Sequence, residues 1–325
     1  MTQSPRKIRW LIAHQPQDLF VRTAQAFSEE LNKRCPGELE VEILTYPEYR
    51  EKYHAIDKLE LLDEKDINID DAIKAFWQAL FDSEIEMSQI QVGQVGELHS
   101  DFHAIDLPFV FDDHDHVKEV LEGPIGQQMC ATLGQKSGVT GLAFTYSGGY
   151  RVIGSNDPIT TVEDLEGLKI VVQNPLTLGT TIESMGGQAV AIPPNLWNKY
   201  DALGKGEADA VETTYLRFNG KHILKTNHSM FMTTIVVSNQ FWNSLTESQQ
   251  QAFRDSAAIA ARRERQWSIE DAEKFEQNAV ANGVTITEIS DADREELKKK
   301  SQLTYFKTKN IFSPGLVSNI RRRLH

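Results

Sequence analysis

Two adjacent amide side chains, Gln173 and Asn174, follow a short apolar segment at residues 168–172. The segment is expected to be a buried strand that runs on, through Pro175, into a helix. Amides offer hydrogen-bond donors and acceptors but no acid, base or nucleophile. This strand end therefore suits the noncovalent binding of a polar ligand. The alternative is that both amides only cap the following helix; their place at the end of a strand favours ligand contact.

Catalytic motifs are missing from the sequence, which contains no GxSxG, no Walker A loop and no HExxH. The best candidate metal ligands are four histidines in one segment: His99, His103, His114 and His116. We favour another interpretation, in which Asp112, Asp113 and Asp115 precede a helix and cap its N–H groups. No catalytic residue, metal or cofactor is therefore expected.

Composition narrows the class of protein. The 325 residues are 40% hydrophobic and 25% charged, and the formal net charge of −13 argues against a nucleic-acid partner. The basic run 321–323 is interpreted as a solvated tail. Cys35 and Cys130 occur outside any CxxC pattern. No apolar run approaches the roughly 20 residues of a membrane span, and no signal peptide is recognised. We expect either a cytoplasmic protein or a mature form whose leader has been removed.

Strands and helices alternate along the chain and predict an α/β protein. Residues 8–13 and 39–46 read as strands around a helix whose apolar face carries Phe20, Ala24, Phe27 and Leu31. A similar pattern restarts after residue 140, and a long helical stretch covers 246–283. Extended segments near 141–150 and 230–237 are expected to cross between two lobes. Ligands of open α/β sheets bind at strand ends, so the Gln173–Asn174 pair should face a cleft.

Several segments, in order, carry a resemblance to a known family. They are "SEIEMSQIQVGQVGELHSDFHAIDLPFVF", "EGPIGQQM", "PITTVEDLEGLKI", "GEADAVETT" and "VVSNQFWNSLTESQQQAF". The third is the most specific, and together they resemble the DctP-type solute receptors of tripartite ATP-independent periplasmic (TRAP) transporters over nearly the whole chain. The resemblance implies a periplasmic-binding-protein-like fold with two lobes, a ligand cleft and a long helix spanning both lobes. We expect lobe 1 at 1–146 plus 232–270 and lobe 2 at 147–231 plus 271–325.

The same resemblance implies a function. The protein would capture a small ligand in the periplasm, with its leader removed, and deliver it as a monomer to TRAP permease subunits. A ligand-sensing protein of the same fold that feeds a regulator is the alternative, and an enzyme on this scaffold ranks last because no activated nucleophile or metal set is present.

Departures from the family pattern bear on the ligand. Where relatives place an arginine that clamps a carboxylate, this chain has Val171, and Thr213 and Thr214 replace an Asn and a Pro. Arg151 matches a second family arginine. A simple carboxylate would lose its bidentate partner, so we expect an uncharged, zwitterionic or larger ligand and weak binding of C4-dicarboxylates and simple keto acids. Val171→Arg should then favour acids, unless Val171 is turned into the lobe core.

Nine residues are predicted to contact the ligand, with Arg151 given the greatest weight. They are Gln15, Gln91, Tyr146, Arg151, Gln173, Asn174, Trp197, Glu212 and Thr213.

Overall fold

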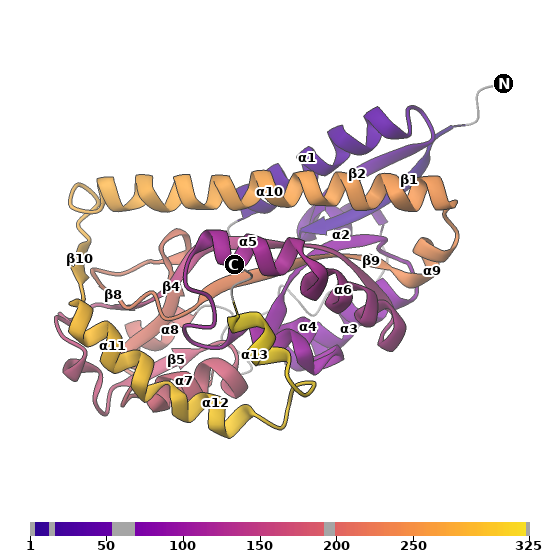
Figure 1. Ribbon diagram of the computed structural model, residues 1–325. Coiled ribbons are helices and arrows are strands. Elements are labelled where there is room, and N and C mark those ends of the chain that lie inside the picture. The colour runs from indigo at the N-terminus through magenta and orange to yellow at the C-terminus, as the bar shows by residue number, and fades with distance from the viewer. Residues whose placement is uncertain (1–3, 13–16, 54–68, 192–198, 323–325) are drawn as a thin grey trace. The chain divides into compact units, whose positions relative to one another are not determined.

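The computed structural model describes residues 4–12, 17–53, 69–191 and 199–322 (Figure 1). The chain forms two compact units. Unit 1 comprises Met1–His99, Lys118–Ser147 and Thr233–Trp267; unit 2 comprises Ser100–Val117, Gly148–Met232 and Ser268–His325. Strands and helices alternate in both, which confirms the predicted α/β class.

Residues 100–117 belong to unit 2, whereas the lobe boundaries inferred from the sequence placed them in lobe 1. The reason is local packing. The backbone N–H of Phe109 donates to the His228 carbonyl at 2.6 Å, and the Phe109 ring packs against the hydrophobic core of unit 2.

Unit 1 is built on a sheet with strand order β2-β1-β3-β9-β4. β1 pairs in parallel with β2 and β3, and β3 pairs antiparallel with β9. The strands are β1 (Arg6–Ile12), β2 (Leu39–Thr45), β3 (Met87–Gln91), β4 (Val139–Ser155) and β9 (Met230–Ser238). The helices of unit 1 are α1 (Gln17–Arg34), α2 (Tyr46–Tyr53), α3 (Ile69–Phe81), α4 (Val92–Leu98), α6 (Pro124–Lys136) and α9 (Asn239–Asn243). Among the described elements, four belong partly to unit 1 and partly to unit 2: β4, β9, α5 (His114–Glu122) and α10 (Glu247–Asn278).

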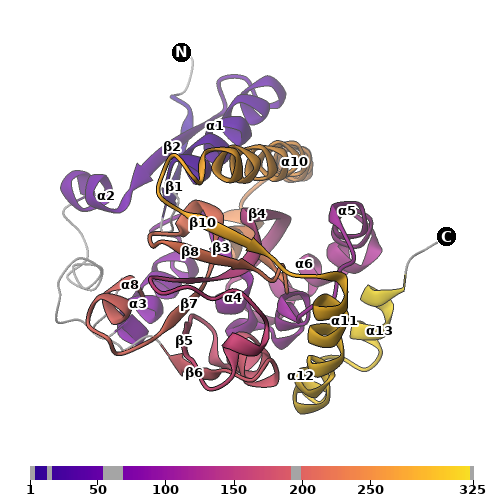
Figure 2. The ribbon, with the colours of Figure 1, turned by 90° about the vertical axis from the view of Figure 1, so that its left-hand side faces the viewer.

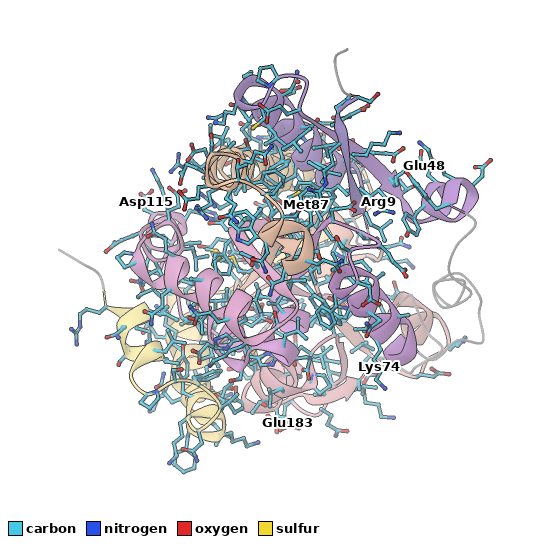
Figure 3. All side chains as sticks on the ribbon, turned by 90° about the vertical axis from the view of Figure 1, so that its right-hand side faces the viewer. Arg9, Glu48, Lys74, Met87, Asp115 and Glu183 are labelled. Carbon is cyan, nitrogen blue, oxygen red and sulfur yellow. The ribbon has the colours of Figure 1, made fainter. Side chains whose placement is uncertain are left out.

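The core of unit 1 follows from the apolar face predicted for α1. Phe27 lies 5.1 Å from Trp10 of β1 and 5.4 Å from Phe253 of α10, measured between ring centroids. α1 and α10 therefore pack on one face of the sheet, side by side in both ribbon views (Figures 1 and 2). Met87 points into the interior while Glu48 and Lys74 point to solvent (Figure 3). The predicted βαβ opening is confirmed.

Unit 2 is built on strands in the order β4-β7-β5-β6, with β8 joined to β4 and β10. β5, β6 and β7 run parallel, and β4 is antiparallel to β7. The strands are β5 (Lys169–Val172), β6 (Gln188–Ala191), β7 (Ala210–Thr214), β8 (His222–Lys225) and β10 (Thr285–Glu288). The helical segments are η2 (Ser100–Asp106), η3 (Glu163–Leu165), η4 (Pro175–Gly179), α7 (Thr180–Ser184), α8 (Lys199–Gly204), η5 (Tyr215–Arg217), α11 (Asp291–Lys300), α12 (Gln302–Thr308) and α13 (Leu316–Arg321).

α10 holds the exposed edge of β4 through its side chains. In unit 1, Arg265 donates to the Phe144 carbonyl at 2.6 Å, and Glu264 accepts the Tyr146 N–H at 2.6 Å. In unit 2, Ser268 accepts the Gly148 N–H at 2.9 Å. These bonds fall on alternate residues of β4, as expected when alternate backbone groups point to one edge of a strand. The long helix predicted at 246–283 thus satisfies a strand edge that would otherwise expose its polar groups.

Glu264 generates a prediction about stability. Its side chain is fully buried, and burial raises the pKa of the carboxyl from 4.5 to about 8, although the Tyr146 N–H opposes the shift. The folded protein therefore holds a proton that the unfolded chain releases, so stability should fall as pH rises from about 4.5 to about 8.

Glu264→Gln removes this titration and keeps an acceptor oxygen for Tyr146. We expect the variant to exceed the native protein in free energy of unfolding by a few kcal/mol at pH 8.5 and by much less at pH 5, since one pKa unit corresponds to about 1.4 kcal/mol. Urea unfolding at both pH values measures this, with the exposed Glu273→Gln of the same helix as control. Equal effects at both pH values would contradict it.

Candidate functional site

The candidate site in unit 2 begins where two parallel strands end. β5 and β7 pair with Val171 opposite Val211, so their carboxyl ends lie at the same edge. Gln173 and Asn174 follow β5 directly, and η5, which ends at Arg217, follows β7. Polar side chains from separate parts of the sequence thus meet at the place where α/β sheets bind ligands.

A buried ion pair joins β4 and β7 on the same face. Arg151 stands opposite Thr214, and Glu212 stands opposite Ile153, so the two charged residues are diagonal neighbours. Arg151 Nη1 donates to both Glu212 oxygens at 2.8 and 2.9 Å. Both side chains are buried, so each charge depends on the other to offset its lost hydration.

Further titratable groups surround this pair. Asp106 Oδ1 lies 4.0 Å from Arg151 Nη2, and His228 Nε2 lies 3.7 Å from Glu212 Oε1. Burial raises the pKa of Asp106 to about 6; Arg151 opposes this shift and Glu212 adds to it. The Arg151 guanidinium therefore already faces two carboxyl groups of its own protein.

The two amides singled out in the sequence have different surroundings. Asn174 Oδ1 accepts the Leu176 N–H at 3.0 Å, and its Nδ2 lies 3.3 Å from Nδ1 of His103. Asn174 therefore caps η4, as the capping alternative proposed. Gln173 makes a different contact, because its Oε1 accepts a hydrogen bond from Arg217 Nη1 at 3.4 Å. Both amides are half-buried, and a ligand-binding role for either stays a prediction.

The remaining predicted contacts fall into three groups. Thr213 pairs with Val152 and, by strand alternation, faces away from Glu212. Gln91 and Tyr146 belong to unit 1, where Gln91 is half-buried at the end of β3 and Tyr146 is buried. Gln15 and Trp197 lie outside the described residues. A ligand-binding role for these residues stays a prediction.

Val171 lies in the core. It is fully buried and packs with Ala202, Ala208 and Val211, while Ile170 and Val172 pack into a second cluster on the other face. A strand of a parallel sheet that is covered on both faces has this continuous apolar pattern. The Val171 side chain therefore points into the core of the lobe, as the alternative made from the sequence proposed.

Sequence reasoning missed three residues of this cluster: Arg217, Phe231 and His228. The Arg151 and Arg217 guanidinium carbons lie 4.4 and 4.9 Å from the centroid of the Phe231 ring. The sequence does contain a signal for Arg217. It is the first charged residue that follows Glu212, just beyond the end of β7. Phe231 lies in an apolar strand and carries no comparable signal.

The histidine segment has a structural role. Asp113 Oδ1 accepts the His116 N–H at 2.8 Å at the start of α5, which confirms the predicted cap for Asp113. Asp115 does not precede the helix as predicted but lies in its first turn. His116 Nε2 contacts the Ile320 carbonyl at 2.8 Å. Within the described part of the chain, no group of three or more His, Cys, Asp or Glu side chains is arranged to hold a metal ion. Cys35 and Cys130 are both buried free thiols.

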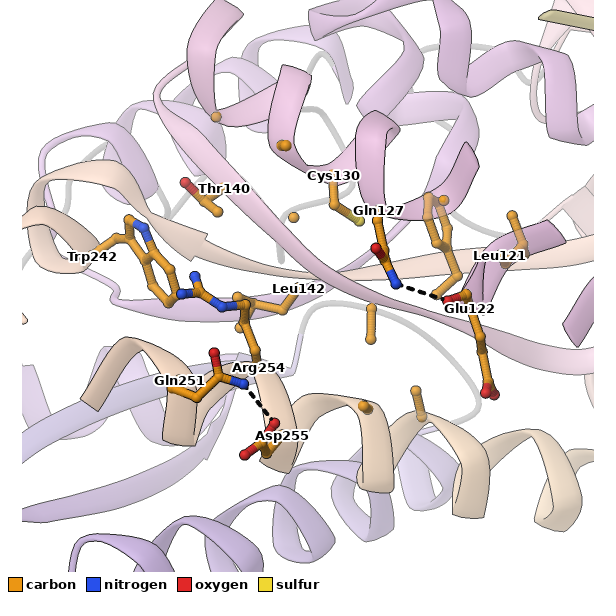
Figure 4. A pocket seen from close by; sticks show the side chains of 18 of the residues that line it. Leu121, Glu122, Gln127, Cys130, Thr140, Leu142, Trp242, Gln251, Arg254 and Asp255 are labelled. Atoms are coloured by element: carbon orange, nitrogen blue, oxygen red, sulfur yellow. Dashed lines mark hydrogen bonds between the residues drawn. The ribbon is translucent and has the colours of Figure 1, made fainter. Parts of the chain in front are cut away.

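Unit 1 contains a cavity of about 720 Å³ between α6, β4 and α10 (Figure 4). Polar side chains that line the cavity contact one another. Gln251 donates to Asp255 at 2.8 Å, and the guanidinium carbon of Arg254 lies 5.1 Å from the centroid of the Trp242 ring. Of the nine predicted contact residues, none of the seven that the structure describes lines it. We therefore place the candidate site at the polar cluster of unit 2, not at this cavity.

The family model described as DctP, bacterial extracellular solute-binding protein family 7, matches residues 12–310. The chain belongs to this family. It is a family of binding proteins and not of enzymes, which agrees with the lack of catalytic motifs. Among the described residues, no helix is both long enough and apolar enough to cross a bilayer.

Two curated relatives illustrate the similarity of this DctP-family chain. A solute-binding protein of Chromohalobacter salexigens is 25% identical over 244 residues, which are 73% of this chain and 72% of the relative. The C4-dicarboxylate-binding periplasmic protein DctP of Rhodobacter capsulatus is 29% identical over 184 residues, 51% of this chain and 54% of the relative. The match to the second relative thus spans about half of its length.

Solved structures confirm the fold. A TRAP periplasmic solute-binding protein of Pseudomonas putida with bound D-glucuronate superposes with a TM-score of 0.80 at 22% identity, covering 98% of each chain. One of Shewanella oneidensis with bound succinate has a TM-score of 0.79 at 18% identity, covering 98% of this chain and 99% of the other. The predicted two-lobed solute-binding fold is confirmed.

The buried ion pair generates a prediction. Arg151→Met would leave Glu212 buried without its cation, so we expect a loss of about 3–5 kcal/mol in free energy of unfolding. Arg151→Met with Glu212→Leu should recover much of that loss. Arg262→Met is the control, because Arg262 bonds Glu122 on the surface, where such pairs contribute about 0–1 kcal/mol. Similar losses for Arg151→Met and Arg262→Met in urea titrations would contradict the prediction.

A second prediction concerns Val171. Since its side chain is fully buried among apolar neighbours, Val171→Arg should cost several kcal/mol of stability instead of creating a site for acids. Val280→Arg is a matched control, because Val280 is 88% exposed and the change should stay within about 0.5 kcal/mol. If the Val171→Arg protein keeps native stability and gains acid binding, the hypothesis that this substitution favours acids would be restored.

Proposed function

We propose that this protein captures a small polar ligand outside the cytoplasm and delivers it to a TRAP-type secondary transporter. Membership of the extracellular solute-binding family across residues 12–310 supports the capture step. A periplasmic location, a monomeric state and delivery to membrane permease subunits are parts of the same proposal. The family name and fold neighbours named as TRAP periplasmic solute-binding proteins support the location and the delivery step.

The observation that carries the ligand proposal is the pairing of Arg151 with Glu212. A carboxylate that replaced Glu212 as the partner of Arg151 would leave Glu212 buried and uncompensated, which is costly. A compact dicarboxylate that needs two cations is therefore a poor match for this cluster. Half-buried Gln173, beside Arg217, suits hydroxyl groups.

The bound ligands of the fold neighbours give a chemical range for screening. Those proteins contain D-glucuronate, galactonate, sn-glycerol-3-phosphate and succinate. Within that range we propose a hydroxyl-bearing acid of sugar size for this chain. The choice agrees with the expectation of a larger ligand and of weak binding by simple diacids and keto acids.

A thermal-shift screen tests the proposal. D-glucuronate and D-galactonate should raise Tm, because a ligand that binds only the folded protein at 100 times its Kd stabilises by about 2.7 kcal/mol. Succinate, malate and pyruvate at the same concentration should give shifts near zero. Mass spectrometry of small molecules released from the purified protein provides an independent identification. The largest shift with succinate would contradict the ligand class, and no shift with any anion or polyol would contradict capture of such solutes.

A further inference from the structure

The cavity between α6, β4 and α10 in unit 1 carries apolar side chains from all three elements. Leu142 and Ala143 of β4, Cys130 of α6, and Ala258 and Ala261 of α10 line it. Leu142, Ala143 and Ala258 are half-buried, so part of their apolar surface still meets water. The volume of about 720 Å³ falls within the range of roughly 300–1,000 Å³ that is usual for small-molecule sites. The cavity can therefore enclose the apolar part of a small molecule.

The space is left open by small side chains. A Cβ at Gly141 would come within 3.0 Å of Cys130, so α6 lies close against β4 at this point. α10 contributes the alanines Ala258 and Ala261, where longer side chains would fill the gap. An apolar group that enters from solution removes this exposed apolar surface from water, which favours its binding.

Charged side chains stand on either side of Leu142 in the close-up of the cavity, with Glu122 on one side and Arg254 on the other (Figure 4). Glu122 accepts a hydrogen bond from Arg262 Nε at 3.0 Å and another from Arg265 Nη2. Arg265 also donates to the Phe144 carbonyl at 2.6 Å. The two arginines beside Glu122 are therefore matched by acceptors of the protein itself.

Arg254 has a different environment. Its guanidinium carbon lies 5.1 Å from the centroid of the Trp242 ring, and within the described residues it makes no hydrogen bond or ion pair. The adjacent Asp255 accepts from Gln251 at 2.8 Å and lies 4.0 Å from Arg34 Nε. Trp242 is buried and supports the exposed guanidinium through a cation–π contact. The N–H donors of Arg254 thus remain for a partner from solution.

The net charge of the cavity lining is opposite in sign to that of the whole chain. Among the described residues that line it, three arginines and two carboxylates leave one positive charge, whereas the chain carries a formal net charge of −13. Since opposite charges attract, the lining favours an anion over a cation, most of all beside Arg254.

We propose that this cavity is a second ligand site and that it binds an amphipathic carboxylate, an acid with one charged group and an apolar chain. The carboxylate pairs with the fork of Arg254, and the chain lies against Leu142 and Ala258 in place of water. Such a ligand contacts β4 and α10 together and stabilises unit 1. The inference goes beyond the proposed function, which concerns the polar cluster of unit 2, and does not depend on it.

Calorimetric titration with octyl compounds of different charge tests the proposal. Octanoate, 1-octanol and octylamine share one chain length and differ in the head group. The native protein should bind octanoate at least tenfold more tightly than octylamine and at least threefold more tightly than 1-octanol. Hexanoate should bind about 15-fold more weakly than octanoate, since each buried CH₂ changes the binding constant about fourfold.

Variants of the cavity lining locate the binding. Arg254→Gln, which removes the cation, should weaken octanoate binding at least fivefold and change 1-octanol binding less than twofold. Ala258→Phe fills the cavity from α10, and Ala131→Phe fills it from an exposed position on α6. Each should weaken both octanoate and 1-octanol at least tenfold. Thermal unfolding without ligand checks that the variants are folded.

Two matched controls lie in unit 2. Arg321 is exposed, and its guanidinium carbon lies 5.0 Å from the centroid of the Tyr305 ring, so Arg321→Gln removes a similar cation elsewhere. Ala292 is exposed on α11, so Ala292→Phe adds the same ring outside the cavity. Both controls should keep the octanoate affinity within twofold of the native value.

Several results would overturn the proposal. Octylamine binding as tight as octanoate binding would reject a site for anions. An octanoate affinity that Arg254→Gln leaves within twofold would reject the role of Arg254, and one that the folded phenylalanine variants leave within twofold would place the binding outside the cavity. Native protein that binds none of the octyl compounds would reject the site itself. All of these results leave the proposed function standing, because sugar acids and small diacids test it.

Discussion

The polar cluster of unit 2 is built around a buried ion pair between a guanidinium and a carboxylate on neighbouring strands. Once Arg151 and Glu212 lose their hydration, each requires the other, and the diagonal register of β4 and β7 brings them together. The pair joins two strands that are distant in sequence. If the ligand binds here as proposed, its charge must be compatible with a compensated pair and with Asp106 beside it.

The site extends outward from this pair to the ends of the parallel strands. Phe231 is in contact with both arginines, so one buried ring lies against the buried guanidinium of Arg151 and the half-buried guanidinium of Arg217. Gln173 and Asn174 are neighbours in sequence but serve different purposes: one contacts Arg217 and the other caps η4. The distinction arises from the chain turning into a helix immediately after Asn174, whose side chain then meets the N–H of Leu176.

In unit 1, the edge of the sheet formed by β4 depends on hydrogen bonds from the helix α10. Alternate backbone groups along one edge of β4, the Phe144 carbonyl and the Tyr146 N–H, bond to Arg265 and Glu264 of α10. A carboxyl buried for this purpose prefers its protonated form. The cavity between α6 and α10 lies beside the same edge, and polar groups that line it bond to one another. The volume of this cavity is therefore not sufficient reason to assign the ligand site to it.

The sequence by itself determined the α/β class, the opening βαβ unit, the long helix and the family, since these depend on apolar periodicity and on motifs local in the chain. Its apolar pattern placed Phe20, Ala24, Phe27 and Leu31 on the buried face of α1, where they lie. It also indicated that Gln173 stands at the end of a strand. Only the tertiary structure decided that Val171 faces an apolar cluster, because a strand covered on both faces carries no alternation to show which residue points where. The same holds for Arg217, Phe231 and Glu212. Their proximity to Arg151 and Gln173 depends on strand order and register, which are set by packing between segments far apart in the chain.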